Sequence, residues 1–213
     1  MVKIYLVRHG YSIGNEKDLI TGHYDCDLNA IGFQQAELIG DYIFKNLDID
    51  AFYSSDLCRA VNTIKPVAER LSMPIICESA FRELSAGAWE GLSFDEALKL
   101  YPKEFTAWVN KEEGAGPIGG ETWESLMDRA TKRLNELVQE CEGKNIVICT
   151  HGGVIKVLQC YFMGKPIQQM TEIDWVSNAS VSEIWYENGK YEMKQMSYDD
   201  YLKDLKTHLP KTV

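Results

Sequence analysis

The apolar positions of this chain repeat with two different periods. Short apolar runs rich in β-branched residues occupy residues 2–7 and 145–150, and a His-Gly pair lies just past each run. Such runs are typical of buried strands in a mostly parallel sheet. Residues 36–47 and 126–141 instead carry apolar side chains at helical spacing, which predicts two amphipathic helices. Two further strands are predicted at residues 51–54 and 74–77. Because strands and helices alternate, we expect an α/β fold, a three-layer α/β/α sandwich around this sheet.

The end of the chain shows another pattern. Residues 181–185 and 190–193 flank the sequence Glu-Asn-Gly at 187–189, which strongly favours a tight hairpin turn. The sheet is therefore expected to finish in an antiparallel edge hairpin. The last dozen residues, which end in Leu209, Pro210 and Lys211, predict a peripheral helix with a frayed end.

Residues 111–120 contain four glycines and one proline, and Thr122 follows as a typical helix N-cap. This composition predicts a flexible loop inside a domain rather than a linker between domains. A chain of 213 residues is long enough for one sizeable hydrophobic core, and it shows no internal repeat. We therefore expect a single domain that spans residues 1–213.

Composition and charge narrow the range of partners. Hydrophobic residues make up 45% of the chain and charged residues 25%, as in ordinary soluble globular proteins. The N-terminus shows no secretory pattern and no window is apolar enough to span a membrane, so a cytoplasmic location and no membrane partner are expected. A net charge of -10 repels nucleic acid and anionic lipid. A phosphate-bearing partner therefore needs a local cluster of positive groups.

The six cysteines form no CxxC pair, and most lie in apolar periodic segments, where a free thiol packs as a small hydrophobic group. Disulfides and a zinc site are therefore not expected. The histidines considered next have no aspartate-rich ligand set beside them, which gives a metallophosphatase little support. We expect neither a metal nor an organic cofactor.

Two of the four histidines share an unusual context. His9 and His151 each lie just past a predicted strand, and each is followed by glycine, Gly10 or Gly152. Ligands of open α/β sheets bind at the carboxyl ends of strands, and a glycine there lets a substrate approach the backbone closely. A single histidine in such a place is more often structural, but two copies of the context favour one shared functional site.

Positive groups accompany these histidines. Arg8 precedes the first of them, and Arg59 follows a segment in which Ser55 or Asp56 is predicted to cap a helix. An arginine in the first turn of that helix adds its charge to a helix N-terminus, and both favour an anion. The arginines and imidazoles together predict a phosphate clamp. Asn15 is a candidate neutral donor, although loop asparagines usually form turns.

Four motifs, in order along the chain, resemble those of a known family. They are Leu6–Gly10 with Ser12 and Asn15, Ser54–Ala60, Arg82–Leu84 with Gly87–Gly91, and Thr150–Gly153. Each motif is short, but their order over nearly the whole chain argues against coincidence. The chain resembles the histidine phosphatase superfamily, specifically its phosphoglycerate mutase-like branch. The segment at 178–182 also resembles the one that this family carries before its late strand.

The resemblance implies a covalent phosphohistidine mechanism. His9 would attack phosphorus, because a neutral imidazole is a competent nucleophile near pH 7. Arg8, Arg59 and His151 would hold the phosphoryl oxygens, which suits a reaction that depends mostly on positioning and charge neutralisation. Glu83 would protonate the leaving group and then activate water.

The same resemblance places Thr21 and Gly22 in a loop that touches the substrate phosphate. Gly152 is added to the substrate-binding residues because it follows the second histidine. We assign no catalytic role to His23, since loop histidines are mostly incidental.

Members of this family are hydrolases or mutases. Mutases usually carry paired arginines and a lysine after the catalytic glutamate, whereas this chain has no arginine between Arg82 and Arg129 and only the lysines Lys99, Lys103 and Lys111 there. The chain therefore offers few positive side chains to bind a second anionic group of a substrate. The resemblance therefore favours a metal-independent phosphomonoesterase of the histidine acid phosphatase type. It would act on a small phosphorylated metabolite, as a monomer or homodimer.

Two alternatives stay open, a phosphoglycerate mutase-type isomerase and a non-catalytic phospholigand-binding module. The binding module is disfavoured because a protein that only binds phosphate would not need Glu83, and that residue is present.

A set of apolar and aromatic residues is either a pocket for the leaving group or, as we expect for most of them, part of the core. Its members are Tyr11, Ile13, Trp89, Phe94, Trp108 and Trp123.

Overall fold

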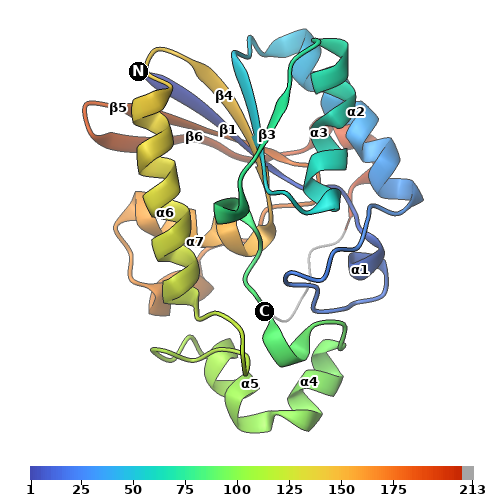
Figure 1. The fold of residues 1–213 in the computed structure, drawn as a ribbon, viewed down its shortest axis with the longest axis vertical. Helices are drawn as coiled ribbons and strands as arrows, with labels where there is room; N and C mark the ends of the chain where they lie inside the picture. Colours follow the sequence, from blue (N-terminus) through green and yellow to red (C-terminus); the bar gives the residue numbers. More distant parts are fainter. Residues whose placement is uncertain (208–213) are drawn as a thin grey trace.

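The computed structural model describes residues 1–207, and these residues contain one six-stranded sheet (Figure 1). Its strand order is β3-β2-β4-β1-β5-β6. The strands span Val2–Arg8 (β1), Ala51–Ser54 (β2), Ile75–Cys77 (β3), Asn145–Thr150 (β4), Val181–Glu187 (β5) and Lys190–Tyr198 (β6). The first four run parallel to one another, and β5 and β6 add an antiparallel edge beside β1. The predicted mostly parallel sheet with an edge hairpin is confirmed.

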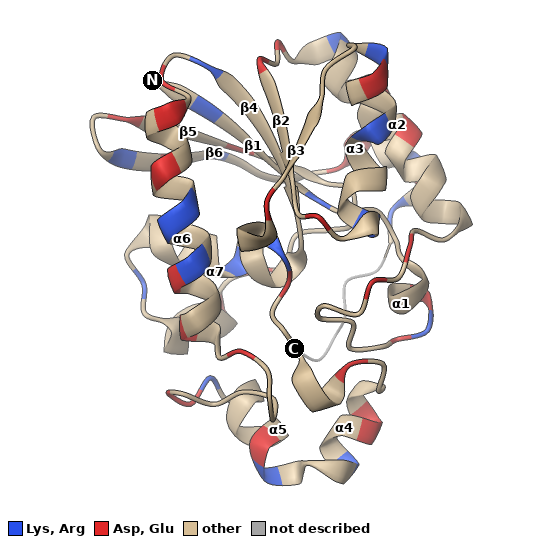
Figure 2. Cartoon of the chain, viewed as in Figure 1, with Lys and Arg blue, Asp and Glu red and all other residues tan. Residues whose placement is uncertain are grey.

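Helices cover both faces of this sheet. The longer ones are α2 (Ala30–Asn46), α3 (Cys58–Arg70), α6 (Trp123–Glu140) and α7 (Gly152–Met163). Successive side chains of β1 point to opposite faces, so Ile4 packs in the core with α6 and α7, whereas Tyr5 packs in a second core with α2 and α3. The three-layer α/β/α sandwich predicted from the sequence is therefore confirmed. Charged residues lie mainly on the helices and loops that cover the sheet (Figure 2).

Shorter helices lie outside the two layers. They are α1 (Ile13–Glu16), α4 (Phe94–Leu100) and α5 (Pro102–Val109). Figure 1 shows α4 and α5 as a small lobe at the foot of the molecule, below the carboxyl ends of the parallel strands. Its aromatic side chains, Phe105 and Trp108, belong to the same core as α6 and α7. The lobe therefore forms a wall beside the strand ends where the functional site is expected.

The predicted helix and strand positions hold with small shifts at their ends. Thr122 is the N-cap of α6, and its side chain accepts a hydrogen bond from the backbone N–H of Ser125, as predicted. Two short 3-10 turns, separated by a kink at Lys203, occupy Asp200–Leu205 in the tail. The rest of the predicted tail helix, including Leu209 to Lys211, lies outside the described residues.

Candidate active site

A cavity of about 520 Å³ opens at the carboxyl ends of β1 and β4. Six of the predicted site residues line it, namely Arg8, Asn15, Thr21, Gly22, Glu83 and Gly152. His9, Arg59 and His151 lie directly behind this lining and are nearly or fully buried. The structure thus brings every predicted site residue to one place, although they are distributed from residue 8 to residue 152.

The His9 ring has a defined tautomer. Its Nδ1 lies 2.7 Å from the carbonyl oxygen of Gly10, and because a carbonyl only accepts, Nδ1 carries the proton and donates it. The Nε2 atom is then left with its lone pair. Burial and the positive charges of Arg59 and Arg8 hold the pKa of His9 well below its ordinary value of 6.5. The ring is therefore a neutral imidazole with a free nitrogen at neutral pH.

The His151 ring lies beside that of His9, with 5.1 Å between the ring centroids and a tilt of 59°. Arg59 donates through Nε to Nδ1 of His151 over 3.3 Å, so the ring proton is on Nε2, which donates to the Ser55 hydroxyl over 2.8 Å. Burial and the nearby Arg59 lower the pKa of His151 well below 6.5. Both histidines are therefore uncharged, and the positive charge of the site resides on the arginines.

The two arginines have more donors than acceptors. Arg8 donates through Nη1 to the Val176 carbonyl over 2.6 Å, while its Nε is buried without any partner in the described chain. Arg59 donates to His151 and to the carbonyls of Gly22 and Tyr24, which uses three of its five N–H groups. Burial lowers the pKa of Arg8 to about 10 and lowers that of Arg59 as well. An oxyanion would supply the acceptors that these groups lack.

The start of α3 differs from the prediction. Its N-cap is Leu57, whose side chain makes no capping hydrogen bond, so neither Ser55 nor Asp56 is the cap. The side chain of Asp25 instead accepts from the backbone N–H of Cys58 over 2.8 Å. Asp56 instead binds both Nε and Nη2 of Arg82, over 2.6 and 2.5 Å. Ser55 Oγ accepts weakly from the backbone N–H of Leu57 and is held by His151, as described above. The cap prediction failed because tertiary partners satisfy both side chains, yet Arg59 does lie in the first turn of α3.

Asn15 contributes an oriented amide. Its Oδ1 accepts from the backbone N–H and hydroxyl of Ser12 and from Nδ2 of Asn178. The amide NH₂ of Asn15 makes no hydrogen bond within the described residues, and Asn15 is one of the residues that line the cavity. Asn178 also donates to the backbone carbonyl of His9 over 3.1 Å. Asn178 thus ties the asparagine to the histidine loop, a role that the motif at 178–182 did not reveal.

The Glu83 carboxylate faces the start of α7. Its Oε1 accepts from the backbone N–H of Leu84 over 2.9 Å, and its Oε2 accepts from that of Gly153 over 3.0 Å. A Cβ atom on residue 153 would lie only 2.3 Å from Oε1, so glycine is needed there for the carboxylate to keep its position. The carboxylate lines the same cavity as Arg8 and Gly152.

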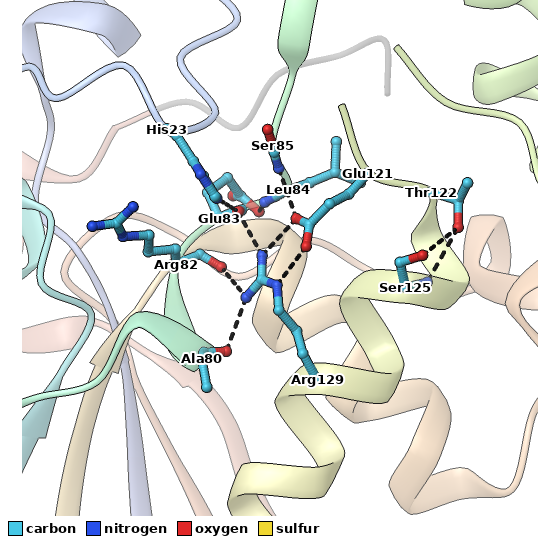
Figure 3. A network of polar contacts seen from close by, with 10 residues as sticks. All are labelled: His23, Ala80, Arg82, Glu83, Leu84, Ser85, Glu121, Thr122, Ser125 and Arg129. Carbon is cyan, nitrogen blue, oxygen red and sulfur yellow. Dashed lines mark hydrogen bonds and ion pairs between the residues drawn. The ribbon is translucent and has the colours of Figure 1, made fainter. Parts of the chain in front are cut away.

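A polar network fixes the backbone of this glutamate (Figure 3). Arg129 of α6 donates to the carbonyl oxygens of Ala80, Arg82 and Glu83 and to both carboxylate oxygens of Glu121. Glu121 in turn accepts from the backbone N–H of Ser85 over 2.9 Å. Sequence reasoning missed both Arg129 and Glu121, because neither lies in a motif and their partners are mostly backbone atoms of distant residues.

His23 has a structural partner. Its Nε2 lies 2.9 Å from the carbonyl oxygen of Glu83, and its backbone N–H donates to Glu90 over 2.8 Å. The ring therefore links the loop at 21–24 to the segment that carries Glu83.

The aromatic residues divide between pocket and core. Tyr11, Phe94, Trp108 and Trp123 line the cavity, together with Trp175, which the sequence analysis did not single out. Trp89 is fully buried in the core, and Ile13 is exposed rather than part of the cavity. Trp108 and Trp123 belong to both the pocket and the core: they line the cavity, yet they are nearly buried. Their rings stack on each other with 5.2 Å between the ring centroids.

No group of three or more histidine, cysteine, aspartate or glutamate side chains within residues 1–207 could hold a metal ion. Within the same residues, every helix is too short or too polar to cross a membrane. All six cysteines are free thiols.

The chain is similar to proteins of one family over most of its length. The family model of the histidine phosphatase superfamily (branch 1) matches residues 4–199. Phosphoglycerate mutase-like protein 4 of Arabidopsis thaliana is 34% identical over 182 residues, which cover 84% of this chain and 77% of that protein. The metal-independent phosphoserine phosphatase of the same plant is 30% identical over 193 residues, which cover 90% and 79%.

A solved structure confirms the fold. Bacillus stearothermophilus YhfR superposes with a TM-score of 0.90 at 26% identity, over 95% of this chain and 100% of that one. The comparisons confirm the family predicted from the four motifs and support phosphatase action. The chain belongs to branch 1 of the histidine phosphatase superfamily.

Proposed function

We propose that this protein hydrolyses small phosphate monoesters through a phosphohistidine formed at Nε2 of His9. One observation carries the proposal: a buried, neutral imidazole directs its protonated Nδ1 to a carbonyl, which leaves Nε2 free beside two arginines with unused donors. A nucleophile next to a preorganised oxyanion site is what phosphoryl transfer requires.

The reaction has two balanced steps. In the first, Nε2 of His9 bonds to phosphorus, the bond between phosphorus and the leaving oxygen breaks, and protonated Glu83 gives its proton to the alkoxide. In the second, Glu83 takes a proton from water, whose oxygen bonds to phosphorus as the P–N bond breaks. Inorganic phosphate leaves, and both His9 and Glu83 return to their starting states.

The remaining predicted residues bind the phosphoryl group. Arg8 and Arg59 neutralise its charge, and the Asn15 amide adds a donor. His151 is proposed to add its Nε2–H by exchanging the Ser55 hydroxyl, to which it donates here, for a phosphoryl oxygen. The N-terminal ends of α7 and of the loop at 21–22 bring the backbone of Gly152, Thr21 and Gly22 close to its oxygens. Because the charge of the site comes from arginines, a metal cation would be repelled rather than bound, which supports a metal-independent phosphomonoesterase of the histidine acid phosphatase type.

The phosphoryl group then passes to water rather than to a second substrate position. The site lacks the paired arginines expected of a mutase, and one relative is a metal-independent phosphoserine phosphatase. A small phosphorylated metabolite is therefore the proposed partner. A cytoplasmic location, a single domain over residues 1–213 and a monomeric or homodimeric state stay predictions.

Hydrolysis of a generic aryl phosphate, with and without a chelator, tests the proposal. We expect chelator-insensitive turnover in the wild type and its loss by at least about a thousandfold in His9→Ala. A rapid-quench mass spectrum should show a phosphoryl group on the peptide that contains His9. His23→Ala is the matched histidine control and should keep that label. Chelator-sensitive turnover, or full activity in His9→Ala, would contradict the mechanism.

An isomerase assay distinguishes the proposed phosphatase from the alternative, a phosphoglycerate mutase-type isomerase. The wild type is given 3-phosphoglycerate with a bisphosphate primer, and formation of 2-phosphoglycerate is compared with release of inorganic phosphate. Phosphate release should dominate. Rapid isomerisation with negligible phosphate release would favour the mutase instead.

A further inference from the structure

Gln35, on α2, is a buried polar side chain that has no part in the phosphate chemistry proposed above. Its exposed fraction is 0%, and it lies among buried glycine, alanine and isoleucine residues of the same helix. A buried amide costs stability unless both of its ends find partners. The Gln35 amide accepts one hydrogen bond and donates another, so both ends are used. Its two partners indicate what the side chain does.

The first partner is the peptide group that joins Gly10 to Tyr11. The N–H of this group belongs to Tyr11 and donates to Oε1 of Gln35 over 2.7 Å. The C=O of the same group belongs to Gly10 and accepts from Nδ1 of His9 over 2.7 Å. A trans peptide group is planar and directs its N–H and C=O to opposite sides, so fixing one end fixes the direction of the other. Gln35 therefore sets the direction of the carbonyl that orients the His9 ring.

The second partner is the C-terminal segment, which we define as residues 199–207. Nε2 of Gln35 donates to the carbonyl oxygen of Leu205 over 2.8 Å. Because a carbonyl oxygen only accepts, the amide nitrogen must face Leu205 and the amide oxygen must face Tyr11. The C-terminal segment therefore leaves the Gln35 amide one orientation, the one that binds the peptide group behind His9.

Other contacts anchor the C-terminal segment independently of Gln35. The Tyr201 ring stacks on Tyr42 of α2, with 4.7 Å between the ring centroids and a tilt of 15°. The Tyr201 hydroxyl donates to the carbonyl oxygen of Ala179, whose own N–H donates to the carbonyl oxygen of Arg8 over 3.0 Å. The Leu205 carbonyl is thus held in place both by α2 and by the end of β1.

These contacts form one continuous chain of amide hydrogen bonds. It runs from Nδ1 of His9, through the peptide group of Gly10 and Tyr11 and the amide of Gln35, to the carbonyl of Leu205. Every member donates in the same direction, so the dipoles polarise one another and strengthen the first acceptor. Attack of Nε2 on phosphorus gives the ring positive charge, and a strong acceptor at Nδ1 stabilises that charge, as a carboxylate does in a Ser-His-Asp triad.

We infer that Gln35 is a positioning residue for the nucleophile: it holds His9 in the tautomer with the proton on Nδ1 and directs Nε2 to the phosphoryl group. The inference rests on the proposed function, since it concerns the same nucleophile. Gln35 acts through the peptide group of Gly10 and Tyr11, and it does not line the cavity. Loss of the amide should therefore slow the attack on phosphorus without weakening the binding of phosphate by the arginines.

Gln35→Met tests the inference, because methionine has a similar length but no strong donor or acceptor. We expect the rapid-quench rate of His9 phosphorylation by the aryl phosphate to fall about tenfold. The inhibition constant of inorganic phosphate should stay within about twofold of the wild-type value. Nitrogen-15 NMR of the histidine rings reports the tautomer directly, and the variant should gain the form of His9 with the proton on Nε2. Gln34→Met, at the exposed neighbouring position, is the matched control and should behave as the wild type.

Thr63→Val separates positioning from a general loss of stability. The Thr63 hydroxyl oxygen accepts from the backbone N–H of Gly10 over 2.8 Å. The substitution thus removes a buried hydrogen bond of the same loop but leaves the bonds of Gln35 in place. We expect a lower melting temperature and an unchanged His9 tautomer. Equal changes of tautomer in Thr63→Val and Gln35→Met would make Gln35 merely structural.

Gln35→Glu provides the conservative variant and decides if Gln35→Met does not fold. A protonated carboxyl group can accept from Tyr11 and donate to Leu205 as the amide does, whereas a carboxylate cannot donate. Burial raises the pKa of a carboxyl group, so the phosphorylation rate relative to the wild type should rise about fivefold as the pH decreases from 8 to 6. A ratio that does not change with pH would overturn the role of the bond to Leu205.

The outcomes separate this inference from the proposed function. If the wild type hydrolyses the aryl phosphate and folded Gln35→Met keeps the wild-type rate and tautomer, the positioning role is wrong and the phosphatase stands. A weaker binding of inorganic phosphate with an unchanged phosphorylation rate would also overturn the positioning role. Absence of hydrolysis by the wild type would overturn the phosphatase, while the NMR measurement would still test the chain of hydrogen bonds. Thermal melting establishes that each variant is folded at the assay temperature.

Discussion

Two arginines lie near Glu83 in the folded protein and differ in how their donors are used: Arg129 donates to its carbonyl oxygen, and Arg8 lines the same cavity. Arg129 of α6 has all five N–H groups on acceptors, three of them backbone carbonyls and two the oxygens of Glu121 (Figure 3). Arg8 makes one hydrogen bond and keeps a buried Nε without a partner in the described chain. The first arrangement is complete without a ligand, whereas the second is not.

This difference in hydrogen bonding suggests that Arg129 stabilises the fold, whereas Arg8 is available to bind a ligand. A fully satisfied arginine stabilises the segment that it binds, and its removal leaves several buried carbonyls without donors. An arginine with unused buried donors costs stability and is retained where a ligand supplies the acceptors. The comparison therefore predicts opposite effects of equivalent substitutions at the two positions.

The largest expected effect is on catalysis at Arg8. Arg8→Met should lower kcat/KM for a phosphate monoester about a thousandfold, because a preorganised donor to the phosphoryl oxygens is lost. The free energy of unfolding should stay the same or rise, since a buried charge with few partners is removed. Steady-state kinetics and chemical denaturation measure the two quantities. A large loss of stability with little loss of activity would make Arg8 structural.

The next largest effect is on stability at Arg129. Arg129→Met should lower the free energy of unfolding by about 2 to 3 kcal/mol, because the carbonyls of residues 80, 82 and 83 and the Glu121 carboxylate lose their donor. Activity at a temperature where the variant is folded should fall much less than in Arg8→Met, through the loosened backbone of Glu83. Denaturant titration provides the measurement. Unchanged stability would remove the contrast between the two arginines.

The smallest effect concerns pH. His9 and His151 have pKa values well below 6.5 in the folded protein, whereas unfolded histidine titrates near 6.5. Between these values the unfolded chain binds more protons, so stability is full above pH 6.5 and falls as the pH decreases below it, by about 1 kcal/mol per histidine for each pH unit. Unfolding titrations at pH 7.5, 6.5 and 5.5 measure the slope. His9→Gln should reduce it, and an unchanged slope would argue against a neutral His9.

The sequence alone predicted the layer order of the fold and the two histidines of the proposed site, whereas Glu83, Thr21 and Gly22 were placed by the family resemblance. Both follow from local signals: the alternation of strand and helix periods reports which faces are buried, and a histidine and glycine after each of two parallel strands must meet at one sheet edge. The same local reasoning placed Arg59 in the first turn of α3. It failed for the helix cap, because Ser55 and Asp56 have stronger partners far away in the chain.

Only the tertiary structure decided which charged side chains find hydrogen-bond partners. Arg129 and Lys156 look alike in the sequence, as single cations on amphipathic helices, and nothing in their neighbours indicates that one meets five acceptors and the other none. Those acceptors are carbonyl oxygens and side chains that only the packing of distant segments brings together. Hydrogen-bond satisfaction depends on atoms within about 3 Å, a distance that residue order does not encode.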